Sequence, residues 1–335
     1  MRASTLAAVS VAVAVFVMGA AAQELQPAPD GNAPRVTYIG NYFGQTPPGA
    51  TPEVFARGIV STDNLEHSAP AFSPDGTEVF WSMWRRPDQG EPQVIMTARC
   101  DGGSWSVPAV ASFSGRRVDA GPVFSADGKR LYFSSADPAP PPPSGTRVYD
   151  IAFVEKQGEG WSEPKCLNLV ARYPELRFVY SPTIARDGTL YFTAFAPGPL
   201  NDFGLYRAEF RNGEYGKPEL LPRNINLPPY LNWTPFIAPD ESYLLFSSNR
   251  GSQPGEVGDL YLSSRLADGS WTDPVNLGTP VNTEGQERFP ALSPDGKYLF
   301  FTRSTEHHSH DIFWVDASTV PALHAATGRS QENPK

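Results

Sequence analysis

Residues 291–301 read Ala-Leu-Ser-Pro-Asp-Gly-Lys-Tyr-Leu-Phe-Phe, and this stretch decides the fold. Within it, proline presets φ, aspartate can hydrogen-bond nearby backbone, and glycine accepts a positive φ. The apolar run that follows is typical of a buried β-strand. The stretch therefore predicts two antiparallel strands joined by a tight turn.

The same pattern occurs four more times along the chain. The five turn aspartates lie 52 to 60 residues apart, and each precedes an apolar run such as Leu-Tyr-Phe: Asp75, Asp127, Asp187, Asp240 and Asp295. Glu241 stands where the fourth copy should have glycine. A repeat of this length built from short strands predicts a propeller or an array.

Two further motifs complete each repeat. A third strand, such as residues 259–263, is followed by a turn and a Trp-Ser-x-Pro motif at Trp105, Trp161 and Trp271, with threonine in place of serine after Trp271 and Tyr215 as the variant of the tryptophan. A short apolar fourth strand comes next. Four strands are the blade of a β-propeller, and the tryptophans are expected to pack between blades.

The fifth repeat ends near residue 316 without a fourth strand of its own. Residues 52–61 align with the fourth strand at residues 274–282, so an N-terminal strand should complete the last blade and remove open sheet edges. The sequence therefore predicts an all-β, five-bladed β-propeller over residues 51–317, with four-stranded blades. Six blades would need an unrecognised blade in a lead-in that is too short.

The N-terminal region has the pattern of an export signal. Residues 1–22 combine a charged start, an apolar core and a small-residue cleavage site after Ala22. An extended lead-in would cover residues 23–50, and residues 318–335 would form a C-terminal tail. We expect a periplasmic or secreted protein with no membrane span after signal removal, an uncleaved anchor being the alternative.

Charge and cysteine content narrow the possible partners. The 335-residue chain has a net charge of −9 and no run of lysine or arginine, which argues against nucleic acid as the main partner. Cys100 and Cys166 are its two cysteines. Export would favour a disulfide, but the geometry is strict, so one bridge and two free thiols both remain open.

The repeated Pro-x-x-Ser-Pro-Asp-Gly-x-x-Leu-Tyr-Phe pattern and the later Asp-Leu-Tyr strands resemble the repeats of TolB-like, WD-repeat-like propellers. The resemblance covers most of the chain and implies an exported bacterial propeller. TolB itself binds partners in the periplasm. Its additional N-terminal α/β domain has no room here, so its particular role does not carry over.

Residues just before each inner strand should surround one mouth of the central channel. Counting three places back from the proline of each repeat gives His67, Asp119, Val179, Asn232 and Glu287. Beside these positions stand Glu66, Tyr180, Trp233 and Arg288, and the loops between second and third strands add Arg85, Arg250 and Arg303. These residue types predict a ligand-binding mouth. The alternative is that they hold neighbouring blades together.

The leading hypothesis is a non-catalytic module that binds a protein, peptide or glycan. As an alternative, Asp119 and Glu287 could face each other as the carboxylates of a glycosidase-like hydrolase, although no known catalytic motif occurs. His307, His308 and His310 could hold a divalent cation, or they could form a solvated polar loop. No other cofactor is expected.

Overall fold

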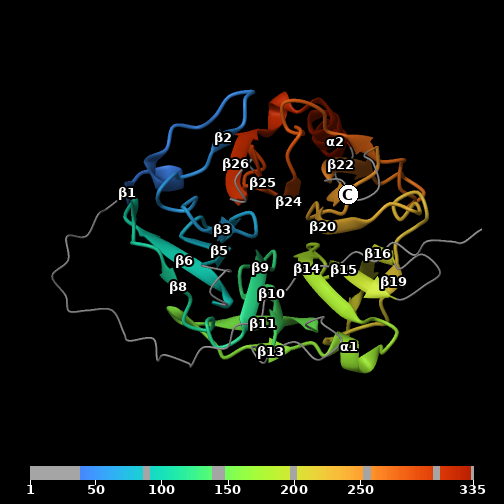
Figure 1. Cartoon of the computed structure of the whole chain (residues 1–335), viewed down its shortest axis with the longest axis horizontal. Helices are drawn as coiled ribbons and strands as arrows, with labels where there is room; N and C mark the ends of the chain where they lie inside the picture. Colours follow the sequence, from blue (N-terminus) through green and yellow to red (C-terminus); the bar gives the residue numbers. More distant parts are fainter. Residues whose placement is uncertain are drawn as a thin grey trace, which may run out of the picture.

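The computed structural model describes residues 38–85, 91–137, 148–196, 202–251, 258–304 and 310–332. The expected signal sequence lies outside these residues. The fold is all-β with a propeller-like arrangement of antiparallel sheets. The first strand of each sheet lies toward the centre of the molecule and the last toward its periphery (Figure 1).

Each of the first two repeats forms one main sheet. The first repeat contributes β3 (Leu65–Glu66), β4 (Ala71–Phe72), β5 (Glu78–Trp84), β6 (Gln93–Asp101) and β8 (Ala109–Val110). The second repeat contributes β9 (Val118–Phe124), β10 (Arg130–Ala136), β11 (Tyr149–Gln157) and β13 (Lys165–Cys166). Smaller elements flank them: β1 (Tyr38–Ile39), the 3₁₀ turn η1 (Asn41–Gly44), β7 (Ser104–Trp105), β12 (Gly160–Trp161) and α1 (Leu169–Arg172).

The third and fourth repeats follow the same plan. The third contains β14 (Phe178–Ile184), β15 (Leu190–Ala196), β16 (Asp202–Ala208) and β19 (Glu219–Leu220), with the hairpin β17 (Phe210–Arg211) and β18 (Glu214–Tyr215). The fourth contains β20 (Asn232–Ile237), β21 (Tyr243–Ser248), β22 (Asp259–Ser264) and β23 (Val275–Asn276).

The fifth sheet joins the two ends of the chain. It contains β24 (Glu287–Leu292), β25 (Tyr298–Ser304), β26 (His310–Asp316) and, from the N-terminal side, β2 (Glu53–Val54). β2 pairs antiparallel with β26, with Glu53 opposite Trp314. The predicted completion of the last repeat by an N-terminal strand is therefore confirmed.

The Ser-x-Asp-Gly turns are fixed by side-chain hydrogen bonds. In the fifth repeat, Ser293 Oγ donates to Asp295 Oδ1 at 2.7 Å and accepts the backbone N–H of Tyr298 at 3.0 Å. Gly296 has a φ of 71°, as the turn requires. The first and second repeats repeat this arrangement with Ser73 and Ser125.

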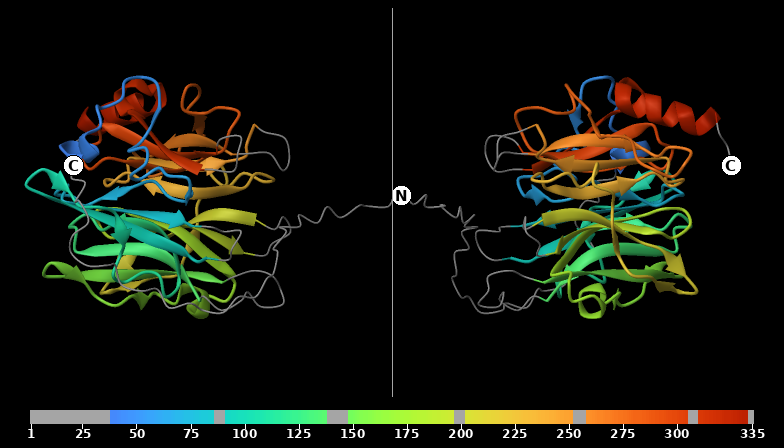
Figure 2. Two further views of the ribbon diagram at one scale, coloured as in Figure 1. Left: turned by 60° about the vertical axis from the view of Figure 1, so that its left-hand side comes forward. Right: turned by 90° about the vertical axis from the view of Figure 1, so that its right-hand side faces the viewer.

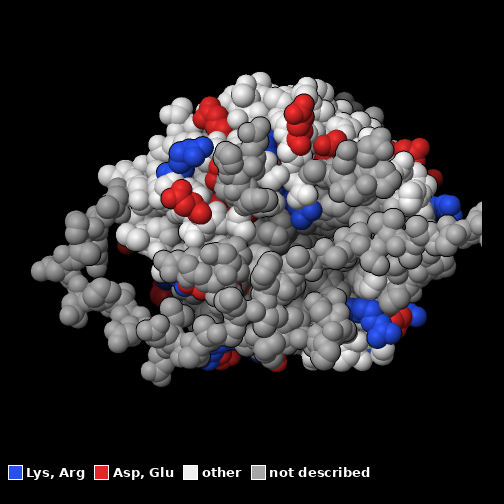
Figure 3. Space-filling view, viewed as in Figure 1, with Lys and Arg blue, Asp and Glu red and all other residues white. Residues whose placement is uncertain are grey.

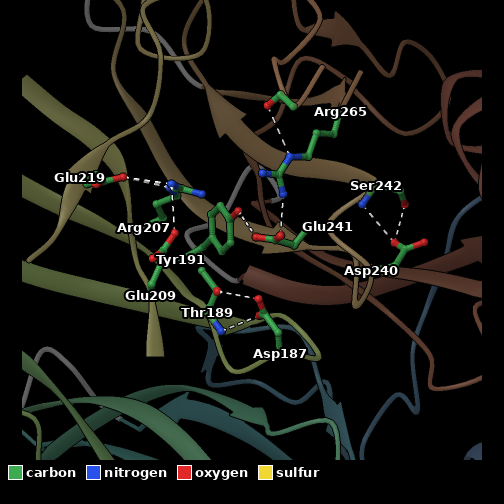
Figure 4. Close-up of polar contacts among 11 residues, drawn as sticks. Asp187, Thr189, Tyr191, Arg207, Glu209, Glu219, Asp240, Glu241, Ser242 and Arg265 are labelled. Carbon is green, nitrogen blue, oxygen red and sulfur yellow. Dashed lines mark hydrogen bonds and ion pairs between the residues drawn. The ribbon is translucent and has the colours of Figure 1, made fainter. Parts of the chain in front are cut away.

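Glu241 replaces the turn glycine of the fourth repeat and still adopts a φ of 58°. Its carboxylate accepts hydrogen bonds from the Tyr191 hydroxyl and from Arg265 Nη1, the latter at 2.5 Å (Figure 4). Tyr191 lies on β15 of the third repeat, and Arg265 directly follows β22 of the fourth repeat. The left-handed conformation is thus held by contacts that a glycine would not make.

Five buried apolar clusters fill the spaces between successive sheets, including the space between the first and the fifth. Trp161 packs between the first two sheets, with ring centroids 5.8 Å from Phe80 and 5.9 Å from Phe124. Trp105 and Trp271 occupy corresponding clusters, and Tyr215 fills this place between the second and third repeats. The predicted packing of the motif tryptophans is confirmed.

The expected C-terminal tail instead contains a helix, after the short turn η3 (Ala317–Thr319). α2 (Pro321–Glu332) lies against the fourth and fifth repeats (Figure 2). Leu323 and Ala326 are buried in the cluster between these repeats. The fifth repeat has no Trp-Ser-x-Pro motif of its own. α2 therefore covers its interface with the fourth repeat, where no motif tryptophan is available.

A hydrogen-bond relay joins the sheets near the centre. The first strand of each later repeat bulges at a residue with positive φ: Gly121, Ser181, Thr234 and Phe289. The bulge N–H donates to a hydroxyl of the preceding repeat: to Ser82 at 3.2 Å, Ser134 at 2.9 Å, Thr193 at 3.0 Å and Thr234 at 3.1 Å, respectively. Buried hydroxyls thus connect neighbouring repeats.

Both cysteines carry free thiols, Cys100 on β6 and Cys166 on β13. Of the alternatives that the sequence left open, the structure therefore has no disulfide. Within the described residues, no helix combines the length and apolarity that crossing a membrane requires.

Replacing Ser134 by alanine should destabilise the fold by about 1–3 kcal/mol, because the buried N–H of Ser181 loses its acceptor. Urea unfolding of purified protein measures this loss. Ser270→Ala is the matched control, since that exposed hydroxyl contacts only Asp268 and should change stability by less than about 0.5 kcal/mol. Equal effects of the two changes would contradict the structural role of the relay.

Replacing Leu323 by alanine should cost about 2–5 kcal/mol, because this side chain of α2 is completely buried against the fourth and fifth repeats. The neighbouring His324 is exposed, so His324→Ala serves as the control on the same helix. Thermal and urea unfolding compare the two. A Leu323→Ala variant as stable as His324→Ala would show that α2 does not stabilise the sheets.

Candidate functional site

The structure corrects one position of the predicted mouth. Glu66, rather than His67, occupies the place equivalent to Asp119 and Glu287. Glu66 accepts a hydrogen bond from Thr62 Oγ1 at 2.9 Å, as Glu287 does from Thr283 Oγ1 at 2.6 Å. The first strand of the first repeat is split into β3 and β4, with one extra residue before Pro70. Counting three residues back from the proline therefore gives a position in the first repeat that is wrong by one residue.

The corrected set, here called the buried ring, consists of Glu66, Asp119, Val179, Asn232 and Glu287. All five side chains are at most 1% exposed. Some of their polar atoms are bonded within their own repeats, whereas Glu66 Oε2, Asn232 Nδ2 and Glu287 Oε2 have no partner among the described residues. Asp119 accepts hydrogen bonds from Ser114 and Ser135, both at 2.8 Å.

Two of the predicted mouth arginines support this ring. Arg303 Nε donates to Glu287 Oε1 at 2.8 Å, and its Nη2 donates to two backbone carbonyls. Arg250 Nη2 donates to Asn232 Oδ1 at 3.2 Å, and its other donors reach nearby carbonyl and hydroxyl oxygens. Both guanidinium groups are therefore already bound by the protein.

The residue that follows each buried-ring residue faces the centre, because alternate residues of a strand point to opposite sides. This channel ring consists of His67, Ala120, Tyr180, Trp233 and Arg288. The Tyr180 hydroxyl lies 3.2 Å from His67 Nδ1, although these residues belong to the first and third repeats. The small side chain of Ala120, in the second repeat, leaves space for this contact.

Arg288 and Trp233 form the other half of the channel ring. The Arg288 guanidinium carbon lies 5.2 Å from the centroid of the Trp233 ring, which is a cation–π contact. Arg288 Nε and Trp233 Nε1 are buried donors with no hydrogen-bond partner in the described part of the chain. The channel ring thus presents a cation and two aromatic rings, all half-buried.

Burial dominates the electrostatics of both rings. It raises the pKa of Glu66 to about 8, with the hydrogen bonds from Thr62 acting against this shift. Burial also raises the pKa of Asp119. It lowers the pKa of His67 to about 3 and that of Arg288 to about 10. At neutral pH, Glu66 and His67 are therefore mostly uncharged, while Arg288 keeps its charge.

Phe289 lies next to the channel ring. It is the bulge residue of the fifth repeat, has a φ of 51°, and is 8% exposed. Its ring centroid lies 4.9 Å from that of His67. The other bulge residues with positive φ are glycine, serine and threonine, so Phe289 contributes the bulk at this level.

The remaining predicted residues are placed as follows. Arg85 Nε lies 3.4 Å from Glu91 Oε2. The His310 ring centroid lies 6.4 Å from that of His67, which brings His310 beside the channel ring. His307 and His308 lie outside the described residues. Among the described residues, no three His, Cys, Asp or Glu side chains are grouped so that they could hold a metal ion.

Acidic and basic side chains are interspersed on the described surface of the face viewed in Figure 3.

Sequence reasoning missed the hydroxyl relay. Its signal was present, because an aromatic residue followed by serine or threonine occurs in the second strand of every repeat, as in Phe133-Ser134. It also missed that Thr-x-x-x-Glu occurs before the first and fifth inner strands, at Thr62 and Thr283.

The fold and site define an all-β protein with a propeller-like arrangement and a cationic, aromatic centre. No protein-family model and no curated protein matches the sequence. Solved structures are similar in fold. A protein of unknown function from Dyadobacter fermentans DSM 18053 is 12% identical, with a TM-score of 0.50 over 83% of this chain and 84% of that one.

Two further structures are similar. An endo-arabinase from Bacteroides thetaiotaomicron VPI-5482 is 12% identical, with a TM-score of 0.50 over 77% of this chain and 95% of that one. A TolB-like protein from Agrobacterium tumefaciens is 17% identical, with a TM-score of 0.47 over 73% of this chain and 72% of that one. At sequence identities this low, the similarity shows a common fold and nothing about function.

The pKa of Glu66 predicts a pH effect on stability. Its pKa is higher in the folded chain, about 8, than the ordinary value of about 4.3, so the folded state binds the proton more tightly. The stabilisation is complete below about pH 4 and is lost as the pH rises toward 8, by up to about 1.4 kcal/mol per pH unit. Urea unfolding between pH 5 and 8 should show a flatter dependence for Glu66→Gln than for the native protein. Glu53→Gln, on exposed β2, should leave the slope unchanged.

Proposed function

We propose that each repeat is one blade of a five-bladed β-propeller closed by β2, and that this propeller binds a protein, peptide or glycan at the channel ring. The observation that carries the proposal is the Arg288 guanidinium beside Trp233, which forms no hydrogen bond or ion pair with the described residues. A carboxylate or sulfate on the ligand would complete its hydrogen bonding. The preferred ligand is therefore an acidic glycan or an acidic peptide.

The chemistry of Arg288 supports an anionic group on the ligand. Burial lowers its pKa, which shows that the cation is poorly solvated where it lies. Within the described residues, no acidic side chain forms an ion pair with Arg288. A charge-assisted hydrogen bond from the ligand would offset this desolvation. Trp233 and Tyr180 would add the aromatic surface on which sugar rings and side chains stack.

The burial of the carboxylates favours binding over hydrolysis. Asp119 is 1% exposed and both its oxygens accept hydroxyl protons, while Glu287 is completely buried and paired with Arg303. A glycosidase places its two carboxyl groups on either side of an accessible bond. A hydrolase using Asp119 and Glu287 would have to expose both. We therefore keep hydrolysis as the alternative function.

We also propose that the protein is exported, to the periplasm or beyond, with its signal cleaved after Ala22. The support is the sequence of residues 1–22, together with the repeat pattern shared with TolB-like propellers. N-terminal sequencing of protein recovered from the periplasmic fraction tests both statements. A mature chain that begins at Met1 would overturn them.

The binding proposal is tested with an array of acidic and neutral glycans and peptides, followed by calorimetry on the strongest ligand. Arg288→Met should weaken binding roughly ten- to hundredfold, because one charge-assisted hydrogen bond is lost. Arg211→Met is the control, since Arg211 is 77% exposed on the peripheral strand β17. Equal affinities of both variants would contradict the assigned site.

The same material distinguishes the hydrolase. If purified protein releases sugars from an array ligand, and Asp119→Asn or Glu287→Gln abolishes that release in a folded variant, the alternative is correct. If the ligand binds and is recovered intact, the result supports the proposed binding function. Circular dichroism confirms the folded state of each variant.

A further inference from the structure

We propose a second binding site at the opposite end of the channel, on the side of the Asp-Gly turns. It would accept an elongated apolar ligand with a hydrogen-bonding group at one end and a carboxylate at the other. This site is separate from the channel ring, because none of the five channel-ring residues lines the cavity. Three features carry the inference: an apolar cavity, an unpaired hydroxyl within it and one arginine at its rim.

The cavity has a volume of about 310 Å³ and is lined by all five repeats. Each repeat contributes the segment between its bulge and its Asp-Gly turn, including a buried proline: Pro70, Pro122, Pro182, Pro235 and Pro290. A volume near 300 Å³ is at the lower end for small-molecule sites. The cavity therefore suits one aromatic or aliphatic group.

The walls favour an apolar body. Phe72, Phe124, Phe236 and Ile184 line the cavity together with the prolines. Proline has no backbone N–H, so the walls offer few donors to a polar ligand at these positions. Transfer of an apolar group from water into such surroundings is favourable in proportion to the area buried.

Ser181 gives the cavity one specific polar group. Ser181 is 4% exposed and lines the cavity, and its Oγ has no hydrogen-bond partner among the described residues. By contrast, Thr183 Oγ1 accepts the N–H of Ile237, and Thr234 Oγ1 pairs with Ser247. The hydroxyl is almost fully enclosed where it lies, so a ligand atom could bond to it only after the Ser181 side chain turns toward the cavity. An unpaired buried hydroxyl is costly, and that bond would recover the free energy.

Arg186 gives the rim its charge. The equivalent position just before the turn aspartate is Pro74, Ala126, Pro239 or Pro294 in the other repeats. Arg186 is exposed, lines the cavity, and its backbone N–H donates to Pro239 O at 2.7 Å, which fixes the turn. Within the described chain, no carboxylate forms an ion pair with its guanidinium. The cation is therefore available to an anionic group.

Ser181 lies in the middle of β14, at its bulge, and Arg186 lies in the turn that follows this strand. The two residues are five positions apart, which is at most roughly 16 Å of extended chain. A ligand that reaches both must be elongated, with its polar groups at opposite ends. The simplest probe with this chemistry is 3-(4-hydroxyphenyl)propionate, whose phenol would reach Ser181 and whose carboxylate would reach Arg186.

The test measures binding of this probe to the full chain by calorimetry and saturation-transfer NMR. Two analogues isolate the ends: 3-phenylpropionate lacks the phenol, and 3-(4-hydroxyphenyl)propanamide lacks the charge. We expect each to bind about five- to tenfold more weakly than the probe, which is the effect of one hydrogen bond or one charge contact.

The variants are matched to the structure. Ser181→Gly removes the hydroxyl and suits the φ of 51° at this position, where the second repeat has Gly121. It should weaken the probe about fivefold and leave 3-phenylpropionate unchanged, since only the phenol contact is lost. Arg186→Met should weaken the probe but not the propanamide. Lys297→Met, at an exposed turn of the fifth repeat, is the charge control.

Three results would overturn the proposal: no binding of the probe by either method, equal affinities of native protein and both variants, or loss of binding in Arg288→Met. The last result would place the probe at the channel ring instead. The experiments therefore distinguish a failure of the proposed function from a failure of this inference. The peptide Gly-Gly-Tyr has the same phenol and carboxylate, so its binding would distinguish a peptide C-terminus from a free aromatic acid.

Discussion

The hydrogen bond between a buried hydroxyl and the bulge N–H of the next repeat determines how the sheets meet. A bulge leaves a backbone N–H without a partner in its own ladder, and a buried N–H needs an acceptor from elsewhere in the protein. Ser82, Ser134 and Thr193 supply the acceptors from the neighbouring sheet. Each sheet is therefore complete only when its neighbour is in place, which couples the repeats.

The same bulges separate two environments along the axis. On one side they turn the channel ring inward, with Tyr180, Trp233 and Arg288 around the centre. On the other side they begin the proline-lined walls of the cavity. The first environment is aromatic and cationic, and the second is apolar with a single unpaired hydroxyl. A repeated strand thus produces two different surfaces because its register changes by one residue at each bulge.

The all-β class, the turns and the pairing of β2 could be predicted because they follow local pattern and repeat alignment. The placement of His67 could not, since one extra residue before Pro70 shifts the count. The helix α2 was missed because its buried residues, Leu323 and Ala326, are too few to give a clear helical period. Burial of Asp119 and Glu287 depends on packing between repeats, which no local pattern reports.

The pairing of β2 with β26 has a consequence for how the chain folds. β2 is synthesised early, yet its partner is among the last strands made, and Ser61 bonds to Ile312 across a separation of 251 residues. Contacts this distant in sequence must await closure of a very long loop, which slows folding. The nascent chain carries an unpaired strand through nearly all of its synthesis. The last sheet can therefore be completed only after β26 has been made.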